Sequence, residues 1–109
     1  MRTLTKLALA GAILIGTALM GVSTAFATDY TIVLDKMKFG PVPAAVHVGD
    51  TIIWQNDDIF HHSATARDQS FDVDLPSKAA VRMVVGAAGS VDFFCKFHPG
   101  MKGTLTILP

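Results

Sequence analysis

The sequence has only one cysteine, Cys95, in 109 residues. A lone cysteine cannot close an internal disulfide, so the chain lacks the cross-links on which small exported domains often depend. It also has no cluster of lysine and arginine, which argues against nucleic acid or an anionic membrane surface as a partner. Linkers, repeats and low-complexity tracts are missing as well, and the length therefore allows one small domain.

The longest apolar stretch lies near the N-terminus. Arg2 and Lys6 precede apolar and small residues from Leu7 to Val22, and Ala25-Phe26-Ala27 follows. A basic start, an apolar segment and an AxA motif are typical of a secretory signal peptide. The stretch is shorter than the about 20 apolar residues of a membrane span, although an uncleaved anchor is the alternative. We expect residues 1–27 to be removed and residues 28–109 to form the exported domain.

Removal of 27 residues leaves 82, with seven basic residues against nine aspartates, a net charge of −2. We expect this domain to be monomeric, with no membrane contact once the signal segment is removed. The core of so small a domain supplies only about 3–5 kcal/mol. A bound metal ion that prefers the folded state would add to this stability.

After the signal segment, apolar residues alternate or form short β-branched runs of strand length. The expected strands are Tyr30 to Leu34, Val46 to Val48, Thr51 to Trp54, Ala79 to Val85, Val91 to Cys95 and Thr104 to Leu108. Turn residues separate them, and no 3.6-residue period persists long enough for a helix. The pattern predicts an all-β fold, an antiparallel sandwich with Greek-key connections.

The strand that ends at Cys95 has a clear alternation. It places Val91, Phe93 and Cys95 on one face, and Asp92 and Phe94 on the other. We therefore expect Cys95 to point inward. The chain then turns at Pro99-Gly100, which puts His98 and Met101 on a short loop at one end of the sandwich.

This loop carries the residues that point to chemistry. Cys95, His98 and Met101 offer a thiolate, an imidazole and a thioether at three-residue intervals. Copper that cycles between Cu(I) and Cu(II) needs ligands that both states accept, and this mixture of soft sulfur and imidazole meets that need. A fourth ligand can come from His61 or His62, in a separate part of the chain. The pattern predicts a copper site for electron transfer rather than for catalysis.

Other readings of the same residues are weaker. Zinc binds cysteine and histidine readily, but the thioether of Met101 is a poor zinc ligand. A binuclear copper centre would need a second cysteine, and a thiol nucleophile would need an open, electropositive pocket. We interpret His47 as an exposed strand residue, Trp54 as part of the core, and Asp57-Asp58 as solvated turn residues.

The mature chain resembles the small blue copper proteins, the cupredoxins of the plastocyanin and amicyanin type, over nearly all of its length. The resemblance rests on Met37-Lys38-Phe39 followed by Pro41 or Pro43, on Val48-Gly49-Asp50-Thr51-Ile52-Ile53-Trp54-Gln55-Asn56, and on the segment from Cys95 to Thr104. The short CxxHxxM loop is more similar to amicyanin than to plastocyanin or pseudoazurin. This resemblance implies one type 1 copper ion held by His62, Cys95, His98 and Met101, with His61 as a solvent-facing neighbour.

The resemblance also implies that the protein is a periplasmic electron carrier and not an enzyme. Such a carrier shuttles one electron between redox proteins. A periplasmic dehydrogenase would be the donor and a c-type cytochrome the acceptor. His98 would present a ring edge at the surface among Phe97, Pro99, Phe60 and Met37. The main alternative is a copper carrier that binds and delivers the ion itself, and a third is an enzyme with an open copper position.

One substitution departs from many relatives. They have an asparagine after the histidine ligand, and its side chain ties the two ligand loops together. This chain has Ser63 at that position. Because serine is shorter, we expect a weaker tie here.

Overall fold

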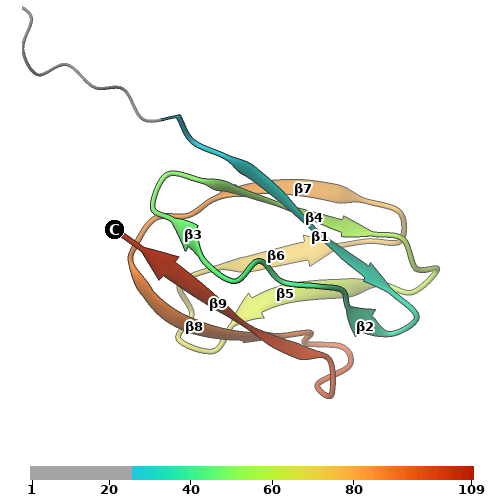
Figure 1. The fold of residues 1–109 in the computed structure, drawn as a ribbon. Helices are drawn as coiled ribbons and strands as arrows, with labels where there is room; N and C mark the ends of the chain where they lie inside the picture. Colours follow the sequence, from blue (N-terminus) through green and yellow to red (C-terminus); the bar gives the residue numbers. More distant parts are fainter. Residues whose placement is uncertain (1–25) are drawn as a thin grey trace, which may run out of the picture.

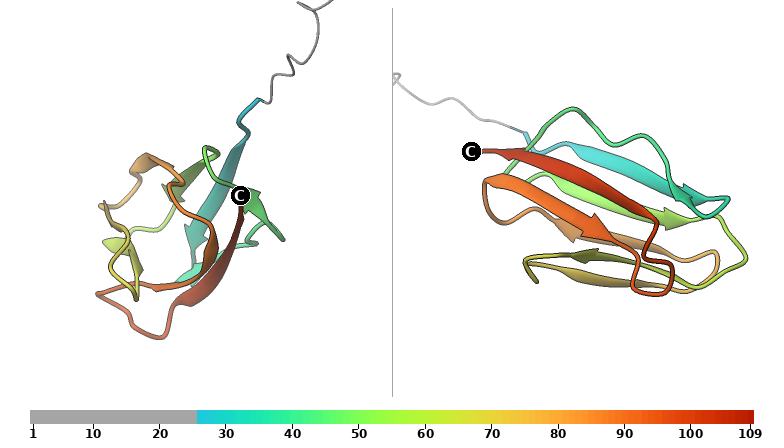
Figure 2. Two further views of the ribbon diagram at one scale, coloured as in Figure 1. Left: turned by 90° about the vertical axis from the view of Figure 1, so that its left-hand side faces the viewer. Right: turned by 90° about the horizontal axis from the view of Figure 1, so that it is seen from below.

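The computed structural model describes residues 26–109. Residues 1–25 of the predicted signal peptide, which spans residues 1–27, lie outside the described residues. The described chain forms two facing sheets (Figures 1 and 2). The strands are β1 (Asp29–Asp35), β2 (Lys38–Phe39), β3 (Val46–His47), β4 (Thr51–Asn56), β5 (His62–Ala66), β6 (Asp72–Leu75), β7 (Ala80–Val84), β8 (Gly89–Phe94) and β9 (Lys102–Leu108). One sheet has the order β2-β1-β4-β7 and the other β3-β9-β8-β5-β6. The prediction of an all-β sandwich is confirmed.

The expectation of purely antiparallel pairing is wrong for two strand pairs. Strands β1 and β4 run parallel, from Asp29 opposite Thr51 to Leu34 opposite Asn56. Strands β3 and β9 are also parallel. Between β2 and β4 the chain crosses to the second sheet through β3, and β4 therefore returns beside β1 in the same direction. Alternation within a strand identifies a sheet surface but not the direction of the neighbouring strand.

Two strands beside the candidate site were not expected from the sequence. Strand β5 reads HSATA, and every residue in it except Thr65 is buried. Its small and polar side chains hide it from a pattern based on apolar runs. Strand β6 reads DVDL, with its aspartates exposed and its apolar residues buried. That alternation was a usable signal, although only four residues long.

Aromatic side chains fill the space between the sheets. The rings of Phe39 and Phe93 meet edge to face with centroids 4.8 Å apart, and those of Trp54 and Phe93 lie 5.2 Å apart. Trp54 and Phe93 are completely buried, which confirms Trp54 as a core residue. Such edge-to-face contacts are favourable and directional. They fix strand β8, whose next residue is Cys95.

Strand β9 passes very close to Phe93 at Gly103. A Cβ atom at this glycine would lie 2.6 Å from Cζ of the Phe93 ring. We expect Gly103→Ala to lower the free energy of unfolding by about 1–3 kcal/mol, because the buried ring has no free space into which to move. Denaturant unfolding measures the change. Gly86→Ala is the matched control, since a Cβ there meets no atom within 4 Å; equal losses in both variants would contradict the steric argument.

Four connections meet at one end of the sandwich. They are residues 36–37, 57–61, 76–79 and 95–101, as the strand registers and Figure 1 show. The two loops with the candidate ligands are therefore neighbours in space. Among residues 26–109, no helix has the length and apolar character needed to cross a membrane.

Candidate metal centre

Strand ends deliver the candidate ligands to this end of the molecule. His62 opens β5, and Cys95 directly follows β8. The Cys95 N–H donates to the Met101 carbonyl at 3.1 Å, and the Met101 N–H donates to the His98 carbonyl at 2.9 Å. These two bonds close the loop from 95 to 101 into a tight turn. The prediction that Cys95 points inward is confirmed, since its side chain is completely buried.

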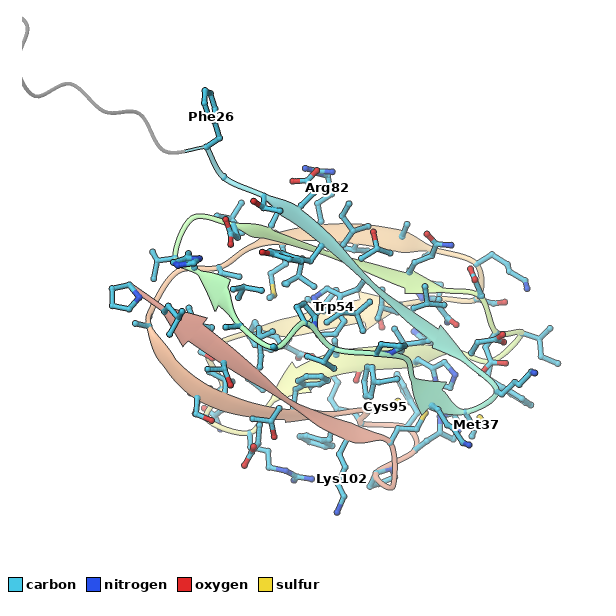
Figure 3. All side chains as sticks on the ribbon, viewed as in Figure 1. Phe26, Met37, Trp54, Arg82, Cys95 and Lys102 are labelled. Atoms are coloured by element: carbon cyan, nitrogen blue, oxygen red, sulfur yellow. The ribbon has the colours of Figure 1, made fainter. Side chains whose placement is uncertain are left out.

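Three side chains converge on one point. Cys95 Sγ lies 3.7 Å from Nδ1 of His62 and 3.7 Å from Nδ1 of His98, and the two Nδ1 atoms are 3.1 Å apart. Figure 3 shows Cys95 at this end of the sandwich, between the sheets. The three residues form a group able to hold one metal ion, and two of them are buried. A soft sulfur with two imidazoles suits copper better than magnesium or calcium, which prefer oxygen.

Met101 lies beside this group. Its side chain is 5% exposed and belongs to the core cluster that includes Cys95. Its backbone bonds to Cys95 and His98 hold the residue in the same tight turn as these two side chains. The buried donor set therefore fits a copper ion, with Met101 available as a fourth, softer donor.

The structure distinguishes the two neighbouring histidines. His62 is completely buried and joins Cys95 and His98, as the family resemblance implied. The His61 side chain is 49% exposed, and its Nε2 lies 2.7 Å from Asp74 Oδ1. Its ring also packs on Phe97, with centroids 4.7 Å apart. His61 therefore faces away from the candidate ligands.

We expect His61→Ala to leave the visible spectrum of the copper-loaded protein unchanged. The substitution removes an exposed contact with Asp74, and even an exposed ion pair would contribute only about 0–1 kcal/mol to stability. His62→Ala, the matched variant one position along, removes a converging nitrogen and should abolish the spectrum. Absorption spectra of the two loaded variants make the comparison, and loss of colour in His61→Ala would reverse the assignment.

Asp58 is part of the site, and the interpretation of Asp57-Asp58 as two solvated acids is wrong for it. The Asp58 side chain is buried, and its Oδ2 accepts hydrogen bonds from His62 Nε2–H and from the Met37 N–H, both at 2.9 Å. The bond from His62, followed by that from Met37, holds the pKa of Asp58 below its ordinary value. Ionised Asp58 thus contributes stability at neutral pH, which is lost only as the pH falls through this lowered pKa. By holding the proton on Nε2, Asp58 turns Nδ1 of His62 toward Cys95.

Asn56 organises the loop that carries Asp58. It is completely buried, and its Nδ2 donates to the carbonyls of Phe60 and Leu75 at 2.8 and 2.9 Å. Its Oδ1 accepts the Asp58 N–H at 2.9 Å. Satisfied buried polar groups of this kind make a loop rigid. Asn56 consequently fixes the position from which Asp58 reaches His62.

A closed ring of hydrogen bonds joins the two ligand loops. The Lys96 N–H donates to Ser63 Oγ at 2.8 Å, and Ser63 Oγ lies 2.9 Å from Thr65 Oγ1. Thr65 Oγ1–H donates to Asp72 Oδ1 at 2.8 Å, and Lys96 Nζ returns to Asp72 Oδ2 at 2.9 Å. Because Thr65 donates to Asp72, Ser63 donates to Thr65. The short serine thus makes a direct tie between the loops, and Thr65, Asp72 and Lys96 extend it.

Exposed apolar side chains lie at the same end of the sandwich as His98. Its ring is half-buried, and the Phe60 ring meets it edge to face with centroids 6.1 Å apart. The exposed large apolar residues at this end are Met37, Ile59, Phe60 and Phe97. We call these four residues the apolar rim. The expected neighbours Met37, Phe60 and Phe97 are thus at the same end as the site, and the sequence analysis missed Ile59.

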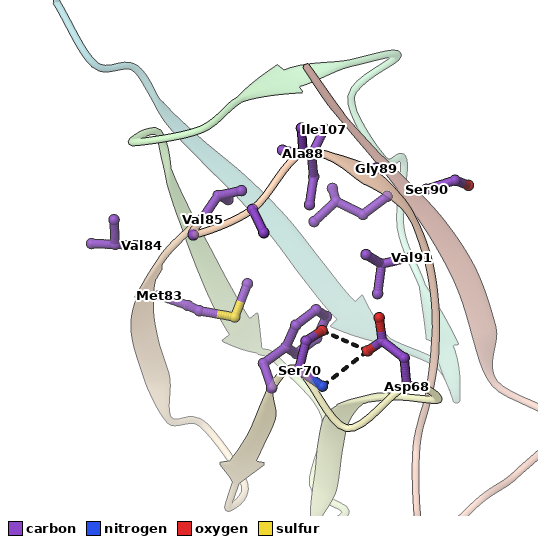
Figure 4. A pocket seen from close by; sticks show the side chains of 14 residues that line it. Asp68, Ser70, Met83, Val84, Val85, Ala88, Gly89, Ser90, Val91 and Ile107 are labelled. Carbon is purple, nitrogen blue, oxygen red and sulfur yellow. Dashed lines mark hydrogen bonds between the residues drawn. The ribbon is translucent and has the colours of Figure 1, made fainter. Parts of the chain in front are cut away.

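A separate cavity of about 310 Å³ lies at the opposite end of the sandwich (Figure 4). Its walls include Met83, Val85, Val91 and Ile107, and Ser70 with Asp68 forms a hydrogen-bonded pair at its edge. None of the candidate ligands lines it. The cavity therefore plays no part in the metal centre.

The fold and site together define a class: a small two-sheet β-sandwich with a buried cysteine and two histidines converging at one end. Comparison with known proteins gives the family. The chain belongs to the cupredoxin-like domain family, whose model matches residues 7–107. The cofactor of this class is one copper ion, and the residues found together here have the pattern of a type 1 copper site.

Individual relatives agree with this family. The chain is 26% identical over 80 residues to amicyanin from Paracoccus versutus, covering 68% of this chain and 61% of amicyanin's length. The Cu(I) structure of an amicyanin mutant superposes with a TM-score of 0.62 at 25% identity, over 72% of this chain and 81% of that one. A purple cupredoxin from Nitrosopumilus maritimus gives 0.65 at 24% identity, over 72% and 99% respectively, and shows the same fold.

Proposed function

We propose that this protein is an exported carrier of single electrons, with His62, Cys95, His98 and Met101 as the ligands of one type 1 copper ion. When bound, the ion supplies a Cu(I)/Cu(II) couple. The observation that carries the proposal is the triangle of Cys95 Sγ and the two histidine Nδ1 atoms, 3.1 to 3.7 Å apart, in which Cys95 and His62 are buried. A thiolate and two imidazoles already gathered in one place suit both oxidation states.

The protein part of this function is to keep the ligands still. Asp58 fixes the ring of His62, and the hydrogen-bonded ring through Ser63 fixes the start of the Cys95 loop. The aromatic core holds β8 directly before Cys95. Ligands held on packed strands and satisfied loops undergo little rearrangement, and low rearrangement favours fast electron transfer.

His98 supplies the route to the surface. It is the least buried of the converging ligands, and Phe60 of the apolar rim contacts its ring. A small apolar contact surface supports short-lived docking, which a carrier requires. We propose a monomeric protein in the periplasm that takes electrons from a dehydrogenase and passes them to a c-type cytochrome. We propose no catalytic role for this protein.

Redox cycling tests the function against the copper-carrier alternative. The copper-loaded protein should bleach with ascorbate and regain its colour with ferricyanide over repeated cycles, with the copper content unchanged. The expected retention follows from the buried, four-donor site. Release of copper on reduction, measured by elemental analysis after desalting, would favour the carrier instead. Colourless copper-loaded protein would contradict both the site and the function.

Met101→Gln should lower the reduction potential while the protein keeps its copper. An amide oxygen is a harder donor than a thioether, so the substitution favours Cu(II) over Cu(I). We expect a decrease of about 59 mV or more, which is a tenfold change for a one-electron couple. Redox titration measures it, with Met83→Gln at the far end of the sandwich as the control. Equal potentials in both variants would remove Met101 from the ligand set.

A further inference from the structure

Thr28, the residue after the predicted cleavage point, is held by both of its backbone polar groups. Its N–H donates to Asp50 Oδ1 at 2.9 Å, and its carbonyl accepts the Thr51 N–H at 2.9 Å. The two described residues before it are both exposed. Ala27 is exposed, and the Phe26 side chain, 89% exposed, points away from the sandwich (Figure 3). The bond between Ala27 and Thr28 therefore marks the outer limit of the packed domain.

Asp50 is a preformed receptor for a group at the nitrogen of Thr28. The residue is only 4% exposed, in the turn between β3 and β4. Its Oδ2 accepts the His47 N–H at 2.8 Å, which leaves Oδ1 facing Thr28. Its own backbone is fixed by bonds to the His47 carbonyl and from the Val85 N–H. The hydrogen bonds from Thr28 and His47 hold the pKa of Asp50 below its ordinary value, so the carboxylate is charged at neutral pH.

We propose that Asp50 binds the α-ammonium group that is created when an export-associated peptidase cuts the chain between Ala27 and Thr28. Hydrolysis adds water to this peptide bond: Ala27 gains a carboxylate oxygen, and the nitrogen of Thr28 becomes an amine. An α-amino group has an ordinary pKa of about 8 and is protonated at neutral pH. The same nitrogen that offers Asp50 one amide N–H before the cut thus offers it a full positive charge afterwards.

The consequence is that processing stabilises the domain. A hydrogen bond between charged groups is about twice as strong as one between neutral groups. Asp50 is largely shielded from solvent, so water screens this pair less than an exposed one. A competing reading is that Asp50 only fixes the turn through His47, in which case the charge on Thr28 has no effect. The two readings differ in a measurable way.

The first experiment locates the cut. The full chain is produced in a bacterial host with its own export machinery, recovered from the periplasm and sequenced from its N-terminus. The proposal requires Thr28 as the first residue. A mature protein that begins at any other residue would overturn it, because the ammonium group would then lie away from Asp50.

The second experiment tests the ion pair without copper, so its result does not depend on the proposed function. The core cluster lies between Tyr30 and Ile107, and residues 28–109 therefore contain the whole fold. Protein that starts at Thr28 is compared with the same protein acetylated on its terminal amine. Acetylation removes the charge but keeps one N–H, and it should lower Tm by about 4 °C or more in a domain of this size.

Two further proteins provide the controls. In a chain that starts at Ala27, acetylation should change Tm by much less, since the charge lies one residue away from Asp50. In the Asp50→Asn variant that starts at Thr28, the effect of acetylation should disappear. An equal effect of acetylation in the Thr28 and Ala27 forms, or none in either, would show that the carboxylate serves the turn alone.

Discussion

Replacement of Cys95 by serine is expected to abolish the strong visible absorption of the copper-loaded protein and to weaken copper binding more than any other single substitution. The hydroxyl matches the thiol in shape but is a hard, protonated donor that does not favour Cu(I). Even the loss of a hydrogen-bond partner behind a ligand costs about 10–100-fold in metal affinity. We therefore expect the loss of this ligand to exceed 100-fold, measured by competition with a copper chelator.

Folding must be checked separately for this variant. Cys95 is completely buried, so a serine hydroxyl without a partner will also lower stability. Circular dichroism and unfolding of the copper-free proteins separate this loss from the loss of metal binding. A serine variant that folds, keeps its colour and holds copper as tightly as the parent would refute the copper site proposed for this protein.

Asp58→Asn has the largest effect that we expect from a residue that does not touch the ion in the proposed site. Asparagine retains an acceptor for His62 Nε2–H but loses the negative charge that raises the basicity of the imidazole. We expect the Cu(II) dissociation constant to rise about 10–100-fold. Chelator competition at neutral pH measures it, with the copper-free unfolding curve recorded beside it.

Asp57→Asn is the matched control for this experiment. Its side chain is exposed and accepts a hydrogen bond from Gln55, so the affinity should not change. The two variants remove the same charge one residue apart, and long-range electrostatics would affect both. Similar affinities in the two variants would show that contact between Asp58 and His62 does not control copper binding.

Much of the fold and of the ligand loop could be predicted, because both follow from sequence patterns within short segments. Alternation in the strand before Cys95 placed that residue on the inner face, and the apolar run around Trp54 marked the core. Spacing in the Cys95 to Met101 loop brought three candidate ligands together in one turn. These are properties of short segments, and they do not depend on which strands become neighbours.

What the sequence did not reveal depends on contacts between distant segments. Strand β5 is buried although its side chains are small and polar, because its backbone pairs with β6 and β8. Asp57 and Asp58 are chemically identical neighbours that face opposite environments, and only the loop wrapped around Asn56 decides which one turns inward. The choice between His61 and His62 has the same origin, since one residue of register exchanges the buried and exposed positions.

The hydrogen-bonded ring that joins the ligand loops also affects self-association. Strand β6 is at the edge of its sheet, and Asp72 and Asp74 on it are exposed. Charged side chains on an edge strand oppose pairing with the edge of another chain, and so protect against aggregation. Asp72 holds Lys96, next to the proposed copper ligand Cys95, through the same carboxylate. A variant that neutralises this edge therefore loses solubility and loosens the ligand loop together.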